Sequence, residues 1–444
     1  MEIAIRKILK SIRPNLFILA AVSIGGALEW YEIGLFISWP LIIWGDSDLF
    51  DESLINAFSL TGVLLMVGFA LASGGIRGIG GWFFGRKGDK EGRKGAFSLT
   101  VLWAAIPSIL LPLFSFFVPF DKWRYWSAII FSITKFIQGM PAGGEFPGAI
   151  CYLAESSRFN SNIAPWIIRR YMCSFTILGP QIGLMLAMIV CLILKSFFSD
   201  KFLLQQGWQY IFLISGMLGI IVYLMRCKLH ETASFLKLKT HNEITTHPVK
   251  TVFTKYLSRI VFGFNLSIFE TALFIVISLI PLYYAQGAFN LPSSVVISFS
   301  IASTLLRSFF LIFIGFLLVK YAEFPWLKVS AWGVIILSIF LYKTLESGSL
   351  FFSLLINIAM IFLYSIQAAI LPSLLAELFP TSVRYTGIAF SFNICDGILL
   401  TVVTSVCFIV MSMNSASFVA LLPISGFLFL LTLKSKHAKY IYFN

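Results

Sequence analysis

Residues 77–94 read Arg-Gly-Ile-Gly-Gly-Trp-Phe-Phe-Gly-Arg-Lys-Gly-Asp-Lys-Glu-Gly-Arg-Lys, and long apolar runs flank this stretch on both sides. A short, basic, glycine-rich turn between two hydrophobic helices is typical of a loop on the cytoplasmic side of a membrane. Gly85 allows the backbone to approach a neighbouring helix closely. We therefore expect a hairpin in which Asp89 faces the N-terminus of another helix and Arg93 faces a carboxylate at a helix C-terminus.

The whole chain has the composition of a membrane protein. Of its 444 residues, 58% are hydrophobic and 12% are charged, and the mean hydropathy is +0.90, whereas soluble domains carry about 25% charged residues. A helix needs about 20 apolar residues to cross a bilayer, and it satisfies its own backbone in lipid. Segments of this kind lie at roughly 15–44, 54–80, 95–118, 125–154, 167–194, 208–229, 258–285, 293–320, 326–344, 349–376, 384–411 and 416–434. We predict an all-α membrane protein with twelve transmembrane helices.

Lysine and arginine are distributed unevenly between the two sides of these segments. Of the 33 residues of these types, 26 belong to the N-terminus, the even-numbered connections and the C-terminal tail, and five belong to the opposite side. Because such residues accumulate on the cytoplasmic side, both termini are predicted to be cytoplasmic. The same bias accounts for the net charge of +13, so we expect no nucleic-acid partner.

The longest polar stretch divides the chain into two sets of six helices. We predict an N-terminal six-helix bundle at 1–229, a cytoplasmic linker at 230–257 and a C-terminal six-helix bundle at 258–444. Two such bundles with approximate symmetry, arranged around a cavity near the middle of the membrane, are the architecture of many secondary transporters.

Signatures of several other function classes are missing from the sequence. The six cysteines form no C-x-x-C pair and the four histidines have no metal-ligand spacing, so we expect neither a metal nor a cofactor. A phosphate-binding loop of the P-loop type is also missing, which argues against ATP-driven transport. We expect no enzymatic activity.

Charged side chains inside the first apolar segment are candidates for proton coupling, because a charge in the membrane is costly without a partner or a function. Glu29 and Glu32 are three residues apart and share a helix face. Burial favours the protonated form of a carboxylate and a nearby cation favours the charged form, which is the balance that a proton site needs. Alternatively, Glu29 pairs with a basic residue. Trp30 and Tyr31 are able to surround a quaternary ammonium group.

Polar residues in three later segments extend this set of candidates. The fourth segment contains Lys135, Gln138 and Glu145 between small residues that permit close helix packing. The seventh and eighth contain Glu270 and Arg307, which either pair with each other or leave Arg307 to bind an anionic group of a substrate. Asp396 in the eleventh segment is a further carboxylate without an assigned role.

Two motifs resemble those of the major facilitator superfamily, and in particular its metabolite:proton symporter family, which includes proline/betaine and 2-oxoglutarate or dicarboxylate permeases. The first motif is Gly85-x-x-x-Asp89-Lys90-x-Gly92-Arg93-Lys94, preceded by Arg77-x-Ile79-Gly80-Gly81. The second is Ala376-Glu377-Leu378-Phe379-Pro380-Thr381-Ser382-Val383-Arg384-Tyr385-Thr386-Gly387. Residues 135–148 and 26–34 are similar to further motifs of that family.

The resemblance implies roles for individual residues. A cytoplasmic gate is implied for Arg77, Gly85, Asp89, Arg93, Glu155, Glu377 and Arg384, with Glu155 pairing with Arg93 and Glu377 with Arg384. Proton coupling is implied for Glu29, Glu32 and Glu145. Together with the residue types, it indicates substrate contacts for Trp30, Tyr31, Lys135, Gln138, Glu270 and Arg307.

The function expected from these features is import of a small zwitterion or organic anion by proton symport with alternating access. The alternatives are a facilitator or exchanger without proton coupling and, as a different class, a membrane sensor that does not transport. The expected partners are the lipid bilayer, a small metabolite and protons. We expect a monomer in a bacterial inner membrane.

Overall fold

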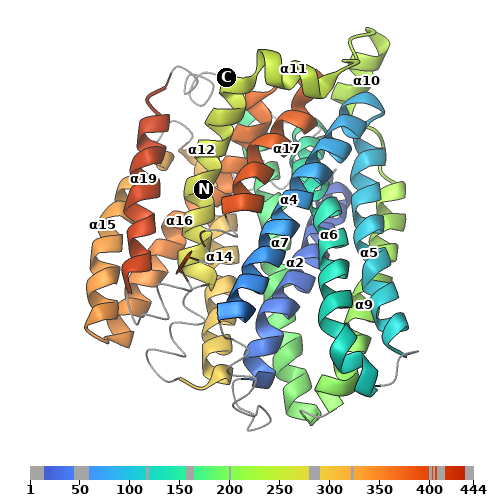
Figure 1. Cartoon of the computed structure of the whole chain (residues 1–444). Coiled ribbons are helices and arrows are strands. Elements are labelled where there is room, and N and C mark those ends of the chain that lie inside the picture. Colours follow the sequence, from blue (N-terminus) through green and yellow to red (C-terminus); the bar gives the residue numbers. More distant parts are fainter. Residues whose placement is uncertain are drawn as a thin grey trace.

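A computed structural model describes residues 15–44, 60–116, 120–156, 165–199, 202–279, 291–321, 325–399, 403, 406–407 and 416–435. Every regular element in these ranges is helical (Figure 1). The α-helices are α2 (Leu16–Trp44), α4 (Leu60–Lys90), α5 (Arg93–Phe116), α6 (Phe120–Ser156), α7 (Pro165–Phe197), α9 (Trp208–Cys227), α10 (Ala233–Thr240), α11 (Pro248–Lys255), α12 (Leu257–Phe274), α14 (Ser293–Lys320), α15 (Trp326–Glu346), α16 (Leu350–Leu378), α17 (Arg384–Ile394) and α19 (Leu421–Thr432). Shorter turns are η3 (Leu203–Gly207), η4 (Ile275–Leu279), η5 (Thr381–Val383), η6 (Cys395–Leu399) and η7 (Ala416–Ala420).

The predicted all-α membrane fold is confirmed. Each predicted segment contains one of the helices above, and α10 and α11 lie in the predicted linker. Counted over the described residues, eight helices are long and apolar enough to cross a membrane. The two termini, which the sequence predicts to be cytoplasmic, lie outside the described residues.

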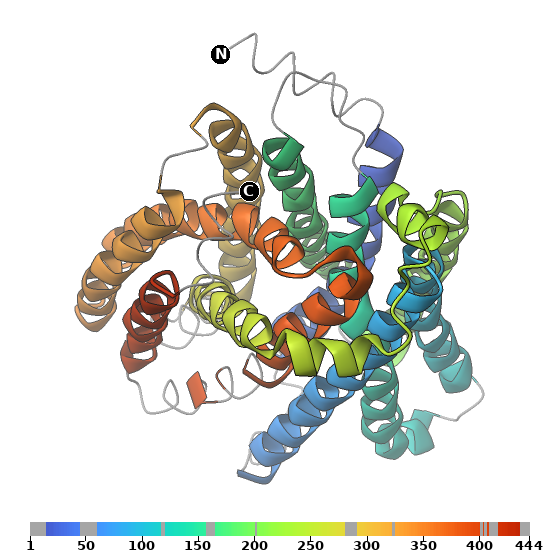
Figure 2. The ribbon, with the colours of Figure 1, turned by 90° about the horizontal axis from the view of Figure 1, so that it is seen from above.

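The helices of the first half of the chain and those of the second half lie on different sides of the molecule (Figure 2). Within the first half, α2 packs against α7, α4 against α6 and α5 against α9; within the second half, α15 packs against α16 and α12 against α19. Several pairs of helices join the halves, among them α7 with α14, α4 with α17, α7 with α16 and α6 with α17. The domain boundaries proposed from the sequence remain predictions.

Small residues allow the closest of these helix contacts, as expected where lipid gives no hydrophobic drive for association. A Cβ atom on Gly183 of α7 would lie 2.0 Å from the carbonyl oxygen of Ala27 on α2. On α4, a Cβ atom on Gly88 would lie 2.1 Å from the ring of Tyr385 on α17. Larger residues at either position would push the helices apart.

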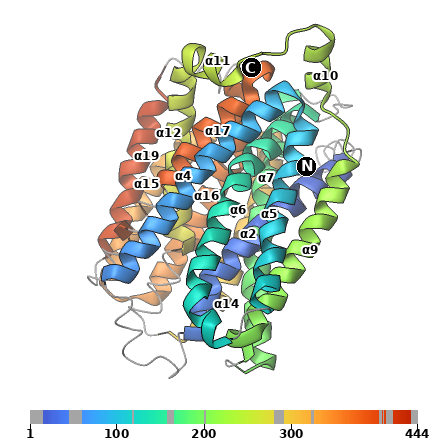
Figure 3. The ribbon, with the colours of Figure 1, turned by 45° about the vertical axis from the view of Figure 1, so that its right-hand side comes forward.

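The two linker helices cover one end of the bundle, which we call the linker end (Figure 3). Helix α10 contacts α6 and η5, and α11 contacts α4, α17 and η5. The hairpin predicted from residues 77–94 lies at this end too, because α4 ends at Lys90 and α5 begins at Arg93. Gly92 between them has a φ of +124°, which favours glycine.

Candidate functional site

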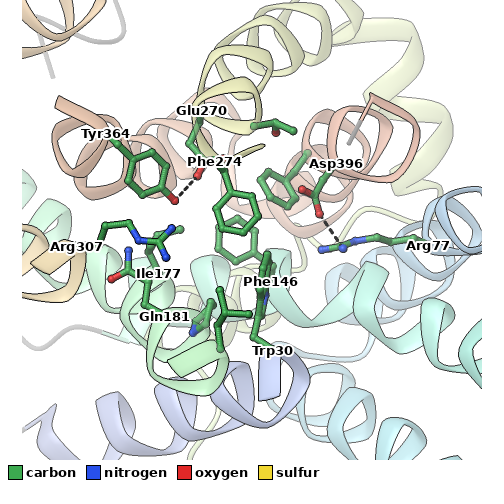
Figure 4. Close-up of a pocket in the computed structure, with 14 residues that line it drawn as sticks. Trp30, Arg77, Phe146, Ile177, Gln181, Glu270, Phe274, Arg307, Tyr364 and Asp396 are labelled. Atoms are coloured by element: carbon green, nitrogen blue, oxygen red, sulfur yellow. Dashed lines mark hydrogen bonds and ion pairs between the residues drawn. The ribbon is translucent and has the colours of Figure 1, made fainter. Parts of the chain in front are cut away.

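A central cavity of about 50 Å³ lies between the two halves (Figure 4). A water molecule needs about 10–15 Å³ of such space, so the cavity has room for a few waters and must enlarge to admit a metabolite. Its lining residues come from both halves and are Trp30, Arg77, Phe146, Ile177, Pro180, Gln181, Leu184, Glu270, Thr271, Phe274, Arg307, Tyr364, Phe392 and Asp396.

One side of the cavity carries hydrogen-bond donors without acceptors. Arg307 is 3% exposed; its Nη1 donates to Ser278 and its Nη2 donates to Thr304 Oγ1 at 2.6 Å. Arg307 Nε and Gln181 Nε2 are buried and find no acceptor among the described residues. Burying a donor without a partner is costly. This side is therefore suited to a ligand that brings acceptor oxygens.

Two carboxylates also line the cavity, Glu270 on the side of Arg307 and Asp396 on the opposite side (Figure 4). Tyr364 donates to Glu270 Oε1 at 3.0 Å, and Arg77 Nη1 lies 2.7 Å from Asp396 Oδ2. The Glu270–Arg307 ion pair, which the sequence left open, is not formed in the described structure. Arg77, expected at the gate, lies instead in the cavity wall.

Aromatic rings separate these two sides. Trp30 and Phe274 meet edge to face with their ring centroids 5.2 Å apart, and both line the cavity. Tyr31, the other aromatic candidate, packs instead against an apolar cluster that includes Leu35 and Leu184. Of this pair, only Trp30 reaches the cavity.

The two glutamates of α2 have different surroundings. Glu29 Oε1 is buried, and no described residue donates a hydrogen bond to it. Glu32 accepts hydrogen bonds from Ser108 at 2.5 Å, Ser215 at 2.7 Å and Gln138 at 2.8 Å. Gln138 thus lies beside Glu32 within the first half. The side chain of Lys135 lies outside the described residues.

Glu145 forms a buried ion pair with Arg226. Arg226 donates to Glu145 through Nη2 at 2.5 Å and Nη1 at 2.8 Å, and Thr100 donates to Glu145 at 2.5 Å. The guanidinium also lies over the Phe97 ring at 3.6 Å. Arg226 was not among the site residues predicted from the sequence, and it is fully buried at the end of α9.

The charged residues of the hairpin belong to a cluster of charges at the linker end. Asp89 accepts hydrogen bonds from the backbone N–H groups of Tyr385 at 3.2 Å and Thr386 at 2.9 Å, at the start of α17. A carboxylate is stabilised at this position by the helix dipole. The contact joins the halves as expected, and Gly85 leaves room for the backbone of Thr386.

Arg93 and Glu155 form the centre of this cluster. Arg93 lies 3.0 Å from Asp89 and donates to Glu155 at 3.1 Å and to the carbonyl of Thr381. Arg384 donates to Glu155 at 2.7 Å. We call Asp89, Arg93, Glu155 and Arg384 the gate cluster.

The predicted Glu377–Arg384 pair is wrong, because Arg384 donates instead to Glu155, which belongs to the other half. Carbonyl oxygens of Ala376 and Phe379 hold Arg384 Nε in this direction. The described cation within ion-pair distance of Glu377 is Arg170, at 3.9 Å.

Residues of the linker complete the cluster, although the sequence did not predict a role for them there. Glu231 accepts from the backbone N–H groups of Arg93 at 3.0 Å and Lys94 at 3.2 Å, so it caps α5. Thr232 donates to Glu155 at 2.9 Å, and the Phe235 ring lies 5.0 Å from the Arg93 guanidinium carbon. Thr232, directly before the start of an amphipathic turn and three residues before Phe235, was the available signal.

Tyr385 is buried at the same end and joins α17 to α6. Its hydroxyl donates to the carbonyl of Gly144 at 2.8 Å. Gly88 and Gly148 leave the space that its ring occupies. This tyrosine therefore fills a socket built from both α4 and α6.

Comparisons with known proteins agree with this architecture. The family model described as "Sugar (and other) transporter" matches residues 18–255. A Staphylococcus aureus (strain MSSA476) protein named "Putative proline/betaine transporter" is 26% identical over 382 residues, which is 84% of this chain and 77% of that protein. An inner membrane metabolite transport protein of Escherichia coli (strain K12) is 26% identical over 388 residues, covering 85% and 84%.

Solved structures share the fold at low sequence identity. The proton:xylose symporter XylE bound to 6-bromo-6-deoxy-D-glucose has a TM-score of 0.71 at 19% identity, covering 96% of this chain and 95% of that one. The human organic anion transporter MFSD10 has a TM-score of 0.65 at 14% identity, covering 94% and 98%. The family match spans more than half of the sequence. This chain therefore belongs to the sugar (and other) transporter family of the major facilitator superfamily, and it is a multi-pass membrane transporter and not an enzyme.

Proposed function

We propose that this transporter imports a small zwitterion together with a proton, by exposing the central cavity alternately to the two sides of the membrane. An organic anion is the second candidate substrate. One relative is named for proline and betaine and another for metabolite transport, which supports the proposal. The bacterial relatives favour a bacterial inner membrane, with the linker end in the cytoplasm where lysine and arginine concentrate.

The observation that carries the proposal is the pair of unsatisfied donors in the cavity. Arg307 and Gln181 both line the cavity, and Arg307 Nε and Gln181 Nε2 have no acceptors among the described residues. A guanidinium binds a carboxylate through charge-assisted hydrogen bonds, which are stronger than neutral ones. A substrate carboxylate at this position would satisfy both donors at once.

The charges around the cavity favour a zwitterion over a simple anion. Two cationic side chains, Arg77 and Arg307, and two anionic ones, Glu270 and Asp396, line it in the described structure. A zwitterion preserves this balance, whereas an anion leaves one negative charge uncompensated. Trp30 and Phe274 offer aromatic faces to a cationic group beside Glu270.

Glu29 is our candidate for the proton site. Its Oε1 is buried without a described donor, unlike the carboxylates of Glu32 and Glu145. Its carboxyl group interacts electrostatically with four charged side chains, namely Arg77, Glu145, Asp396 and Arg226. Glu29 lies on the same turn of α2 as Trp30, which lines the cavity.

Uptake into proteoliposomes tests the proposal. We expect labelled proline or glycine betaine to accumulate only under an inward proton gradient, and 2-oxoglutarate, citrate and D-xylose not to accumulate. Accumulation of xylose or of a carboxylate alone would overturn the substrate class. Equilibration that ignores the gradient would indicate a facilitator or exchanger, and no uptake of any compound would favour the sensor.

Two variants assign the roles in the same assay. Glu29→Gln should abolish gradient-driven accumulation but keep exchange of substrate, while Glu346→Gln, at an exposed carboxylate, should leave both unchanged. Arg307→Gln should weaken substrate binding about 10-fold or more, since hydrogen bonds to charged groups contribute about 1.5–3 kcal/mol. Unchanged accumulation in Glu29→Gln would exclude Glu29 as the proton site.

A further inference from the structure

An ion pair in the cavity wall connects the two halves of the transporter. Arg77 belongs to α4 in the first half and Asp396 to η6 in the second, and their side chains are 12% and 9% exposed. Arg77 Nε also donates to Asn393 Oδ1 at 3.2 Å, and Asn393 Nδ2 donates to the carbonyl of Gly143 at 2.6 Å. We call the Arg77–Asp396 pair the cavity clasp.

The cavity clasp is exposed to whatever enters the cavity. Both of its residues line the cavity (Figure 4). Asp396 Oδ2 lies 2.7 Å from Arg77 Nη1, yet no described N–H or O–H group is aligned to donate a hydrogen bond to it. The contact is therefore an electrostatic attraction without directional hydrogen bonding, and a competing cation meets an incompletely satisfied carboxylate.

The clasp lies at one end of a continuous contact between α4 and the segment of η6 and α17, which we call the seam. At its cavity end, a Cβ atom on Gly74 would lie 1.9 Å from the carbonyl oxygen of Gly397. Farther along, Gly81 lies against Ala389 and Gly85 against Thr386. The seam ends at the gate cluster, where Asp89 binds the start of α17. One helix pair thus connects the cavity to the closed end.

We propose that the cationic group of the substrate takes the place of the Arg77 guanidinium on Asp396, and that this exchange releases the seam. The inference rests on the proposed function, because it requires a substrate with both charges. The substrate carboxylate binds Arg307 and Gln181, and its cationic group binds between Glu270 and Asp396. Figure 4 shows Arg307, Gln181 and Glu270 on one side of the cavity and Asp396 on the other.

The exchange changes the sign of the force between the halves. Before binding, Arg77 of the first half attracts Asp396 of the second. After binding, the cationic group stays with the carboxylates of the second half, and Arg77 faces a like charge across the seam. Asp396 remains compensated throughout, whereas Arg77 loses its carboxylate partner, and a buried charge without a partner is strongly unfavourable, so the loss favours separation of the halves. A substrate without a cationic group leaves the clasp closed.

Hydrogen–deuterium exchange of the purified full-length transporter measures the state of the seam. The probes are two pairs of compounds, each a zwitterion and an analogue in which carbon replaces the charged nitrogen. The pairs are glycine betaine with 3,3-dimethylbutyrate and proline with cyclopentanecarboxylate. Each pair has a closely similar shape and differs in the cationic group. We expect the zwitterion that is transported to speed exchange in residues 77–90 and 384–396, and its analogue to leave exchange unchanged. Equal effects of both members of a pair would overturn the inference.

Substitutions test the clasp without a ligand. Asp396→Asn should speed exchange along the seam about tenfold, the change expected when a partly exposed ion pair is lost from a locally opening segment. Glu270→Gln, which removes the neighbouring carboxylate and keeps the clasp, should exchange like the wild type. The double variant Arg77→Asp/Asp396→Arg should restore slow exchange.

The outcomes separate this inference from the proposed function. If zwitterions are transported but Asp396→Asn exchanges like the wild type, the clasp is wrong and the function stands. If no zwitterion is transported, the proposed function is wrong, and so is the proposed displacement of Arg77 from Asp396 by the substrate. Slow exchange in the double variant together with fast exchange in Asp396→Asn also excludes simple misfolding as the cause.

Discussion

The gate cluster and the central cavity both contain buried arginines, but these arginines differ in how completely their N–H groups are paired. At the linker end, Arg93 contacts Asp89, Glu155 and a carbonyl oxygen. In the cavity, Arg307 contacts two hydroxyl groups, and its Nε finds no acceptor among the described residues. Arg93, which connects the halves, is satisfied within the protein, whereas Arg307, which we propose to bind substrate, is left incomplete. The same residue type thus marks a lock in one place and a proposed binding site in the other.

Replacing Arg93 or Arg307 by methionine gives the largest expected contrast in melting temperature. Arg93→Met leaves Glu155 and Asp89 without their shared cation, and breaking a buried pair costs about 3–5 kcal/mol. We expect the melting temperature in detergent to fall steeply and uptake to be lost. Arg86→Met, at an exposed arginine of the same hairpin, serves as the control and should melt like the wild type. An unchanged melting temperature for Arg93→Met would contradict the role given to the gate cluster.

Arg307→Met should act in the opposite direction on stability. Replacing a buried charge that lacks an acidic partner by an apolar side chain of similar length is neutral or stabilising by about 1–4 kcal/mol. We expect the substrate-free variant to melt at or above the wild-type temperature while losing substrate binding, as measured by thermal shift with and without substrate. A strong loss of substrate-free stability would show that Arg307 has a structural role like that of Arg93.

Asp89→Asn removes a charge from the lock but keeps a side chain that can accept a hydrogen bond from α17. The interaction of a carboxylate with a helix N-terminus contributes about 0.3–2 kcal/mol. We expect the maximal uptake rate to fall while the substrate concentration at half-maximal rate stays the same, because the cavity is unaffected. Initial rates measured over a range of substrate concentrations test this. A changed half-maximal concentration with an unchanged rate would go against it.

Thr232→Ala gives the smallest effect. The hydroxyl caps α10 by accepting from Phe235 N–H and also donates to Glu155, and loss of such a cap costs about 1 kcal/mol. A drop of a few degrees in melting temperature is expected, and Thr232→Ser should recover it. If serine fails to recover stability, packing of the methyl group matters more than the two hydrogen bonds.

The sequence was sufficient to predict features that depend on local pattern. Apolar length predicted the helices, and the motif around Asp89 and Arg93 predicted the turn between the end of α4 and the start of α5. It did not separate Glu29 from Glu32. Residues three apart on a helix differ by about 60° in direction, and this difference turns Glu32 toward Ser108 and Ser215 while Glu29 has no such donors.

Pairings between distant helices were beyond the reach of spacing alone. Arg226 and Glu145 are 81 residues apart, and Arg384 and Glu155 are 229 apart. Each pairing depends on how helices from different parts of the chain cross. Periodicity within one helix carries no information on that crossing, which is why Glu377 was expected to hold Arg384.

The socket around Tyr385 has a consequence for how the linker end responds to hydrostatic pressure. When the halves separate there, the ring leaves the space beside Gly88, Gly144 and Gly148, and water takes its place. The ring fills this socket in close contact with Gly88 and Gly148, so opening it eliminates little internal void, and the volume change on which pressure acts scales with such voids. Pressure alone would therefore shift the linker end only weakly toward the open state.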